Sequence, residues 1–552
     1  MTQAAPLPAD FKLPLEMFYQ WEQQQPNKTW LRQHDGAQWR DYSWSEAGTT
    51  ARQLAAGLLA QGLNAGDKVG LYAENCAHWV IADVAIMMAG LVSVPIYTSM
   101  PEDKIRYVVD HSEMKLLLVG DQCALSVAEV NTAFGQQVKV LGIGYQSEDW
   151  QSLSDQAPAL TGNPQRDADD LWSIAYTSGT TGLPKGVMHS FCTMPSSVHD
   201  IRELCGTNPD SRYFSYLPLA HIAERSVVEL HSLYSGGSVG FNRSKETFVE
   251  DLLEIRPTFF FSVPRIWANL KAGIVAQMGE QAWQRCIDEP EFGKATGEKV
   301  LASMGLGDVE LALTGSAPIP PSDIEAWGRL GMPLCEGFGQ SESMSVAFNR
   351  KENFKVGSIG LPISDRAEMK ISDQGELLLR SPGNMVGYFK APEKTAETIV
   401  DGWIHTGDKA RIDEDGFVFI TGRVKDIFKT AKGKYVAPAP IENAFALFTG
   451  IEQCCLVGRG FPQTIMLAVL SDGITRTDEL HNALQAHMQK INSTLEAHER
   501  MSHVVISEAP WSIENGLLTH TLKVLRDDVE THHADSLQKA MAGDDSVCWE
   551  AS

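Results

Sequence analysis

Small and hydroxylated residues are concentrated in one loop, which runs from Tyr176 to Gly186 and also contains a lysine. The loop reads YTSGTTGLPKG and follows a strand-like apolar run that begins at Leu171. Glycines and hydroxyl side chains let backbone N–H groups approach phosphate oxygens closely, and Lys185 adds positive charge. A plain surface turn uses similar residues. Because eight of the eleven positions are Gly, Ser, Thr or Lys, we interpret the segment as a phosphate-binding loop.

The spacing in this loop differs from the two commonest phosphate-binding patterns. A Walker A loop needs a glycine directly before its lysine, and Pro184 stands there instead. The loop also lacks the G-x-G-x-x-G spacing of a dinucleotide-binding turn. The residues alone therefore indicate phosphate binding by some other fold.

Four later segments, together with this loop, resemble the adenylate-forming (AMP-binding) superfamily. That family includes acyl-CoA synthetases, adenylation domains of peptide synthetases and beetle luciferases. In order, the segments resemble its adenine and magnesium segment (EGFGQSE, 336–342), its ribose segment (WIHTGD, 403–408), its hinge (GRVKD, 422–426) and its catalytic-lysine segment (NGLLTHTLK, 515–523). The resemblance spans about residues 40 to 530.

The resemblance implies ATP and CoA as substrates and Mg²⁺ as cofactor. It places nucleotide contacts at Thr177, Ser178, Gly179, Thr180, Thr181, Gly182, Lys185, Gly315, Ser316, Ala317, Glu336, Gly337, Phe338, Gly339, Gln340, Ser341, Asp408 and Arg423. Phe338 would stack on adenine. Asp408 would accept hydrogen bonds from both ribose hydroxyls, a task that suits a carboxylate, and Arg423 would contact the ribose from the other side.

The same resemblance assigns the reacting and moving groups. Lys523 would bridge the substrate carboxylate and the α-phosphate, which a flexible ammonium can do. Glu342 and Thr177 would hold Mg²⁺, a cation that prefers oxygen ligands. Lys425 would be the hinge about which the C-terminal domain turns between two half-reactions. After that turn, Gly433 and Lys434 would face the CoA tunnel. One departure lies at His520, where relatives usually have proline, so the loop loses a restriction on φ.

Three segments resemble the long-chain acyl-CoA synthetase branch and imply a fatty acid of medium or long chain. In LPLAHIAER, 217–225, His221 would line the acyl entrance. In RPTFFFSVPRIW, 256–267, Trp267 would be the aromatic gate of the acyl tunnel, and Phe259–Phe261 also fit a buried strand. The third segment is GKYVAP, 433–438.

The sequence leaves three activities open. The first is a fatty acyl-CoA synthetase. The second is adenylation of a different carboxylic acid, or transfer to a carrier protein instead of CoA. The third is a non-catalytic acyl or nucleotide sensor, which the presence of Lys523, Glu342, Asp408 and Arg423 disfavours. The acyl chain length and the choice between monomer and homodimer also stay open.

Composition narrows the class of protein. The chain has 552 residues, of which 43% are hydrophobic and 21% charged, as in ordinary globular proteins. Its formal net charge of −24 disfavours non-specific nucleic-acid binding, so no nucleic-acid partner is expected.

Nine cysteines without a CxxC motif indicate a reduced, cytoplasmic protein without structural zinc. The first residues show no signal-peptide pattern. We expect at most transient peripheral contact with a membrane, because a fatty-acid substrate partitions there.

Alternating helix and strand patterns must position these residues. Residues 43–46 (SWSE) fit a capping box that opens a helix. The run from Trp79 to Tyr97 is mostly apolar but contains Asp83, Gly90 and Pro95, so we expect a buried helix and a buried strand rather than a membrane span. Such units recur to about residue 340, which predicts an α/β fold.

We therefore expect an α/β protein with two domains. The N-terminal domain, residues 1–422, would stack mostly parallel sheets with helices and would bind AMP and the acyl group. Short alternating runs with Gly and Asp turns predict a small β-barrel-like subdomain within it, at about 345–420. A small mobile α+β domain, residues 423–552, would act as a lid.

Overall fold

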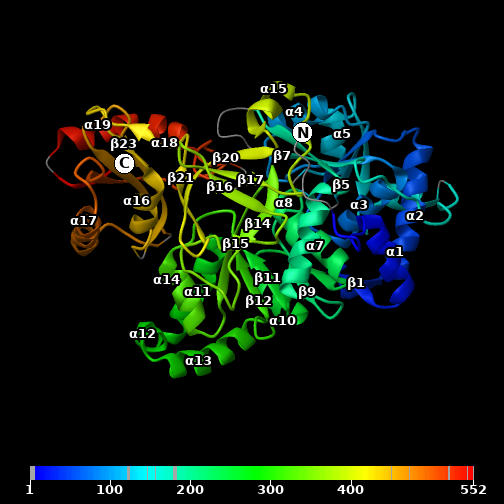
Figure 1. The fold of residues 1–552 in the computed structure, drawn as a ribbon, viewed down its shortest axis with the longest axis horizontal. Coiled ribbons are helices and arrows are strands. Elements are labelled where there is room, and N and C mark those ends of the chain that lie inside the picture. The colour runs from blue at the N-terminus through cyan, green and yellow to red at the C-terminus, as the bar shows by residue number, and fades with distance from the viewer. Residues whose placement is uncertain are drawn as a thin grey trace.

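The computed structural model describes most of the chain. The described residues are 7–120, 123, 125–145, 147–155, 157–177, 183–448, 450–471, 473–519, 523–543 and 545–550. Figure 1 shows a large body that carries the N-terminus and, in orange and red at one side, a smaller body formed by the C-terminal elements. The α/β fold class with a separate C-terminal domain is thereby confirmed. The numerical domain boundaries and the mobility of the smaller domain stay predictions.

The first large sheet has nine strands, parallel in its centre and antiparallel at both edges. Its spatial order is β15 (Leu361–Pro362), β14 (Ser343–Phe348), β13 (Leu334–Gln340), β12 (Leu311–Thr314), β11 (Phe259–Ser262), β9 (Arg212–Ser215), β10 (Ser238–Phe241), β1 (Thr29–His34) and β2 (Trp39–Ser43). Because β11, β12 and β13 are parallel, the segments that follow their carboxyl ends meet at one edge of the sheet.

The second large sheet has seven strands and contains the strand that leads into the glycine-rich loop. Its order is β18 (Gly387–Tyr388), β8 (Lys185–Ser190), β7 (Leu171–Thr177), β4 (Val92–Pro95), β3 (Lys68–Tyr72), β5 (Leu116–Gly120) and β6 (Lys139–Ile143). Five strands, from β7 to β6, are parallel, and β8 and β18 extend the sheet in antiparallel pairing.

Helices pack around and between these sheets. They are α1 (Pro14–Gln24), α2 (Trp44–Ala60), α3 (Ala77–Ala89), α4 (Glu102–Ser112), α5 (Val127–Phe134), α6 (Glu148–Asp155), α7 (Thr193–Cys205), α8 (Ile222–Glu224), the π-helix η1 (Arg225–Leu230), α9 (His231–Ser235), α10 (Phe248–Ile255), α11 (Pro264–Met278), α12 (Glu280–Asp288), α13 (Pro290–Ser303), α14 (Pro321–Arg329) and α15 (Pro392–Thr398).

The apolar run from Trp79 to Tyr97 is confirmed as a buried helix and a buried strand. Every residue of α3 and of β4 is buried. Asp83, which interrupts the run, pairs with the buried Arg225 of η1 at 2.6 Å, and Arg225 also donates to Ser173 of β7 at 2.6 Å. Buried charges require such partners. No helix among the described residues is long and apolar enough to cross a membrane.

The predicted capping box at the start of α2 is half correct. Ser43 is the N-cap, and its side chain accepts a hydrogen bond from the backbone N–H of Glu46 at 3.1 Å. The Glu46 carboxylate does not return to the Ser43 backbone but accepts from Arg40 at 2.9 Å. A nearby arginine offers the carboxylate a charged donor, which is stronger than a neutral N–H.

A five-stranded antiparallel sheet lies between the large sheets and the C-terminal domain (Figure 1). Its strands are β16 (Glu368–Ile371), β17 (Glu376–Arg380), β19 (Ile399–Val400), β20 (Trp403–Ile412) and β21 (Val418–Arg423). The C-terminal domain has the hairpin β22 (Phe428–Lys429) and β23 (Tyr435–Val436), a sheet of β24 (Ile451–Val457), β25 (Thr464–Leu470), β26 (Met501–Ile506) and β27 (Val547–Trp549), and helices α16 (Pro438–Phe445), α17 (Asp478–Asn492), α18 (Arg526–His532) and α19 (Ala534–Ala542).

Candidate active site

The two ends of the glycine-rich loop are fixed by an antiparallel pair. Strand β7 ends at Thr177, strand β8 begins at Lys185, and these residues are direct partners in the ladder. A Cβ at Gly186 would lie 2.7 Å from Ile174 Cγ2, so the close packing of the two strands requires glycine there. The predicted contacts Ser178, Gly179, Thr180, Thr181 and Gly182 lie outside the described residues.

Lys185 points toward groups from two other segments. Its Nζ lies 5.4 Å from the centre of the Tyr388 ring. Burial, reinforced by the positive charge of Lys394, lowers the pKa of Lys185, whereas the negative charge of Glu342 raises it. The lysine that begins β8 therefore lies within electrostatic reach of the predicted metal carboxylate.

The second segment follows β12 and β13 at their carboxyl ends. A Cβ at Gly315 would approach the carbonyl oxygen of Gly337 to 3.0 Å, so the turn through Gly315, Ser316 and Ala317 lies against β13. Ser316 has a φ of +69°, in the left-handed region that non-glycine residues seldom adopt. Such strain is often found at functional sites. The structure thus brings these two predicted nucleotide segments together.

Glu336 is a buried carboxyl on β13. Its burial raises the pKa from 4.5 to about 8. One of its oxygens, Oε2, has no hydrogen-bond partner among the described residues. A buried polar atom without a partner is costly and is suited to meet a donor from a bound molecule. Phe338 and Gly339 follow on the same strand, and both are half-buried. Phe338 packs against the hydrophobic core of the small antiparallel sheet.

The second and third segments are joined by a direct hydrogen bond. Gln340 donates from Nε2 to Asp408 Oδ2 at 2.5 Å and to the carbonyl of Thr406 at 3.0 Å. Asp408 also lies opposite Arg423 in the β20–β21 ladder, and its Oδ1 is 3.0 Å from Arg423 Nε. Burial raises the pKa of Asp408, and the positive charges of Arg423 and Lys523 oppose that rise.

Lys523 enters the same region from the C-terminal domain. Burial, together with Arg423, lowers the pKa of Lys523, while Asp408 and Glu342 raise it. The residue as a whole keeps access to solvent. Protein on several sides can desolvate an ammonium whose surface is still reached by water. Lys523 donates its backbone N–H to Thr519 Oγ1 at 3.0 Å, and residues 520–522, including His520, lie outside the described residues.

Glu342 is held by partners that sequence reasoning missed. Tyr388 donates from its hydroxyl to Glu342 Oε1 at 2.7 Å, and the backbone N–H of Met385 donates to the Glu342 carbonyl at 2.8 Å. His189 donates from Nε2 to the Ser341 carbonyl at 2.8 Å. Burial lowers the pKa of His189 to about 4, so its imidazole is neutral at physiological pH. Because β18 has only two residues, no periodicity could have revealed Tyr388.

The residues present fit Mg²⁺ in the way that nucleotide enzymes bind it. Among the described residues, no group of three or more His, Cys, Asp or Glu side chains could hold a metal. Mg²⁺ bound with ATP typically takes one or two protein oxygens and fills its other positions with phosphate oxygens and water. Glu342 has a second carboxylate oxygen, which accepts no hydrogen bond from the described residues, and Thr177 supplies a hydroxyl at the end of β7.

The predicted acyl residues occupy two different environments. His221 is the N-cap of α8, where Nδ1 accepts from the N–H of Ala223 at 3.1 Å, and its ring meets that of Tyr97 edge-on at 6.4 Å. Trp267 is fully buried between Phe260 and Trp327 and donates to the carbonyl of Leu313 at 3.3 Å. In this arrangement Trp267 is a core residue, and its role as a gate stays a prediction.

The residues predicted for the hinge and for the CoA tunnel all lie on the surface. Lys425 is exposed in the turn after β21. Gly433, with φ +76°, and the exposed Lys434 form the turn of the β22–β23 hairpin.

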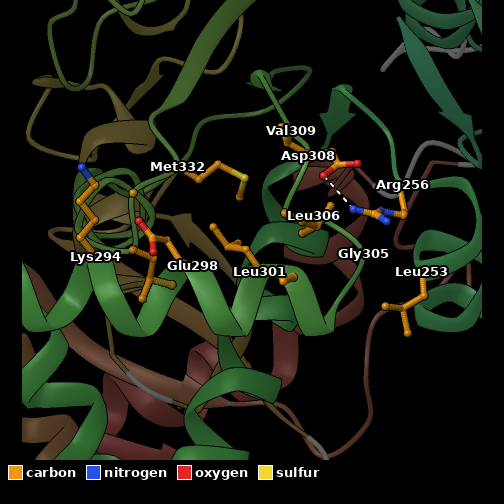
Figure 2. A pocket seen from close by; sticks show the side chains of 14 residues that line it. Leu253, Arg256, Lys294, Glu298, Leu301, Gly305, Leu306, Asp308, Val309 and Met332 are labelled. Carbon is orange, nitrogen blue, oxygen red and sulfur yellow. Dashed lines mark hydrogen bonds and ion pairs between the residues drawn. The ribbon is translucent and has the colours of Figure 1, made fainter. Parts of the chain in front are cut away.

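A cavity of about 480 Å³ lies away from all of these residues (Figure 2). It is bounded by α10, α13 and the turns before β12 and β13, and Arg256 and Asp308 form an ion pair at its edge. Those turns precede the strands, whereas Gly315 and Phe338 lie at or beyond the opposite end. The cavity is therefore at the amino edge of the parallel sheet, and substrates of α/β sheets bind at the carboxyl edge.

Comparisons with known proteins identify the family of the chain. The family model described as AMP-binding enzyme matches residues 18–389, and the one described as AMP-binding enzyme C-terminal domain matches residues 425–545. Fatty acyl-CoA synthetase A of Dictyostelium discoideum is 29% identical over 89% of this chain and 85% of its own. Long-chain-fatty-acid--CoA ligase FadD15 of Mycobacterium bovis is 29% identical over 95% and 96%.

A solved structure shares the fold. The anthranilate CoA ligase AuaEII, in complex with anthranoyl-AMP, superposes with a TM-score of 0.77 at 21% identity, over 96% of this chain and 98% of that one. The family match covers most of the chain, and it includes both the segments around Glu342 and the domain that carries Lys523. The chain therefore belongs to the AMP-binding enzyme family, the adenylate-forming group that includes the acid–CoA ligases.

Proposed function

We propose that this protein activates a fatty acid of medium or long chain with ATP and transfers the acyl group to CoA. The products would be acyl-CoA, AMP and pyrophosphate. The observation that carries the proposal is the meeting of Lys523, from the C-terminal domain, with Asp408, Arg423 and Glu342 of the N-terminal domain. A cation close to two carboxylates and a second cation can follow charge as it moves between two anionic substrates.

In the first half-reaction, a carboxylate oxygen of the fatty acid attacks the α-phosphorus of ATP. A bond forms between them, and the bond to pyrophosphate breaks. Lys523 would stabilise the negative charge on the carboxylate and α-phosphate oxygens. Lys185 and the glycine-rich loop would hold the β- and γ-phosphates, and Asp408 would hold the ribose. When bound at Glu342 and Thr177, Mg²⁺ would neutralise phosphate charge.

In the second half-reaction, the thiol of CoA attacks the acyl carbon and AMP leaves. The C-terminal domain would turn about Lys425, so that Lys523 withdraws and the hairpin turn at Gly433 and Lys434 faces the thiol. Turns with few hydrogen bonds absorb such φ/ψ changes. The exposed position of Lys425 and the surface hairpin are compatible with this motion.

Fatty acid is the substrate class that the relatives favour. Two similar chains are named for fatty acyl and long-chain fatty acid substrates. His221 beside the buried Tyr97 would border the acyl entrance, and Trp267 would be the aromatic gate of the acyl tunnel. The alternative is a different carboxylic acid, as in the anthranilate ligase of similar fold, or a carrier protein as acceptor.

The test measures AMP and pyrophosphate release with ATP and Mg²⁺ across saturated fatty acids of about six to eighteen carbons, with anthranilate and benzoate alongside. AMP formation that needs both CoA and a fatty acid is the expected result. Pyrophosphate exchange with a fatty acid but without CoA-dependent AMP release would favour a carrier-protein acceptor. Turnover with aryl acids alone would overturn the fatty-acid assignment, and no exchange with any acid would favour a non-catalytic sensor.

A further inference from the structure

Tyr388 touches both the phosphate lysine and the metal carboxylate of the proposed site. Its hydroxyl donates to Glu342 Oε1 at 2.7 Å, and its ring faces Lys185 Nζ at 5.4 Å from the ring centre. The tyrosine is 5% exposed, so both contacts are shielded from bulk water. A single side chain thus contacts both Lys185 and Glu342.

The backbone of Tyr388 is fixed on both sides. It pairs with Val187 in the β8–β18 ladder, next to the pair of Gly387 with Met188. Its N–H donates to Thr395 Oγ1 of α15 at 2.9 Å. A Cβ on Gly387 would lie 2.8 Å from Thr395 Cγ2, so α15 can approach the strand this closely only because residue 387 is glycine. The ring position is therefore set before any ligand arrives.

The Tyr388 hydroxyl is the donor in this contact, because an ionised carboxylate offers only acceptor oxygens. A donor bound to one carboxylate oxygen fixes the rotation of the carboxylate and the direction of its other oxygen.

We propose that Tyr388 is a positioning residue for the metal–nucleotide complex, which orients the carboxylate of Glu342 so that its second oxygen faces the phosphates held by Lys185. This role rests on the proposed function, because that function assigns Glu342 to Mg²⁺ and Lys185 to phosphate. It adds a residue that does not itself touch metal or nucleotide. Donors that orient a metal ligand typically change metal affinity about 10–100-fold when removed.

The competing explanation is that Tyr388 only fills the core. It packs in a cluster with Val187, Leu377 and Ile404. Tyr388→Phe separates the two explanations, because it keeps the ring, the packing and the contact with Lys185 but removes the hydroxyl. The matched control is Tyr19→Phe on α1, which also removes one phenol hydrogen bond, to the carbonyl of Pro164 at 2.9 Å, far from the site.

The experiment titrates Mn²⁺, as a spectroscopic substitute for Mg²⁺, into each protein with ATP and follows free Mn²⁺ by electron paramagnetic resonance. We expect Tyr388→Phe to bind Mn²⁺ at least about tenfold more weakly than wild type in the presence of ATP. Tyr19→Phe should bind Mn²⁺ with the affinity of wild type. The two variants should have similar melting temperatures. In a Glu342→Gln background, Tyr388→Phe should have no further effect on Mn²⁺ affinity, because the carboxylate that it orients is gone.

Activity provides a second readout. The Mg²⁺ concentration for half-maximal pyrophosphate exchange should rise in Tyr388→Phe, and thioester formation from supplied acyl-adenylate should be unchanged. If wild type binds Mn²⁺ with ATP and Tyr388→Phe binds it equally well, the positioning role is wrong while the proposed function stands. If wild type shows no ATP-dependent Mn²⁺ binding and no exchange with any acid, both are wrong.

Discussion

Arg265 and Glu452 form an ion pair between the two domains, with Nη2 of the arginine 2.6 Å from Oε1 of the glutamate. Arg265 lies at the start of α11, close to Trp267, and Glu452 lies on β24 of the C-terminal domain. The pair therefore stabilises the arrangement in which Lys523 lies near Asp408 and Glu342. This is the arrangement that the proposed adenylation step would use.

Charge reversal at this ion pair should slow adenylation selectively. Partly exposed pairs contribute about 0.2–1 kcal/mol, so Arg265→Glu should slow pyrophosphate exchange by up to about fivefold. Thioester formation from supplied acyl-adenylate should not slow, because the proposed mechanism assigns it to a different domain arrangement. The double variant Arg265→Glu with Glu452→Arg should recover the exchange rate. Arg285→Glu, which breaks the exposed pair with Glu289 within the N-terminal domain, is the control. Equal slowing of both half-reactions would contradict this role.

Removing the ammonium of Lys523 should abolish one half-reaction and spare the other. Lys523→Ala leaves the carboxylate and α-phosphate oxygens without their cation, which we expect to lower the pyrophosphate exchange rate by about 10²–10³-fold. Conversion of supplied acyl-adenylate and CoA to thioester should be largely unaffected. Lys539→Ala, at an exposed lysine on α19 of the same domain, should change neither rate. If both half-reactions fall together, the assigned role is wrong.

The family could be predicted from the sequence because its motifs lie in contiguous segments. Three contiguous segments each contain predicted site residues. They are the loop before Lys185, the EGFGQSE run and the segment that ends at Lys523. The fold brings these segments close to one another. Alternating periodicity was likewise sufficient for the parallel sheets. Asp83 in its apolar run predicted a buried helix rather than a membrane span, although its partner Arg225 could not be inferred.

The partners of these residues could not be predicted, since they depend on which strands become neighbours. Tyr388 reaches Glu342 only because a two-residue strand joins the edge of β8. His189 reaches the Ser341 carbonyl across two sheets. Glu46 was expected to complete a capping box, but its carboxylate accepts a charged hydrogen bond from Arg40 instead. In each case a long-range or charged contact determines the partner, and the local sequence pattern does not reveal it.

Restricting the hinge should have the opposite kinetic effect to removing Lys523. Lys425→Pro fixes φ at the turn after β21, where the backbone N–H of Lys425 donates no hydrogen bond to the described residues. Pyrophosphate exchange should persist, and thioester formation should fall by an order of magnitude or more. Lys425→Ala keeps rotation and should retain both rates. Rapid thioester formation in Lys425→Pro would show that the domain turns elsewhere.

Glu336 should make the stability of the protein depend on pH. Its folded pKa of about 8 lies above the ordinary 4.5 because of burial, so the folded state binds this proton more tightly than the unfolded state. Below pH 4.5 both states are protonated. Between pH 4.5 and 8 the unfolded state alone loses the proton, and the free energy of unfolding falls by about 1.4 kcal/mol per pH unit. Above pH 8 the loss levels off.

Glu336→Gln removes this titration while keeping a polar side chain of the same shape. We expect the melting temperature of Glu336→Gln, relative to wild type, to rise steadily from pH 5 to pH 8 and then to level off. Glu352→Gln, at an exposed glutamate, should show no such trend. Saturating ATP should stabilise wild type less at pH 9 than at pH 7, because a protonated Glu336 accommodates the nucleotide without a buried negative charge. A pH-independent difference between Glu336→Gln and wild type would mean that Glu336 is ionised in the folded protein across this range.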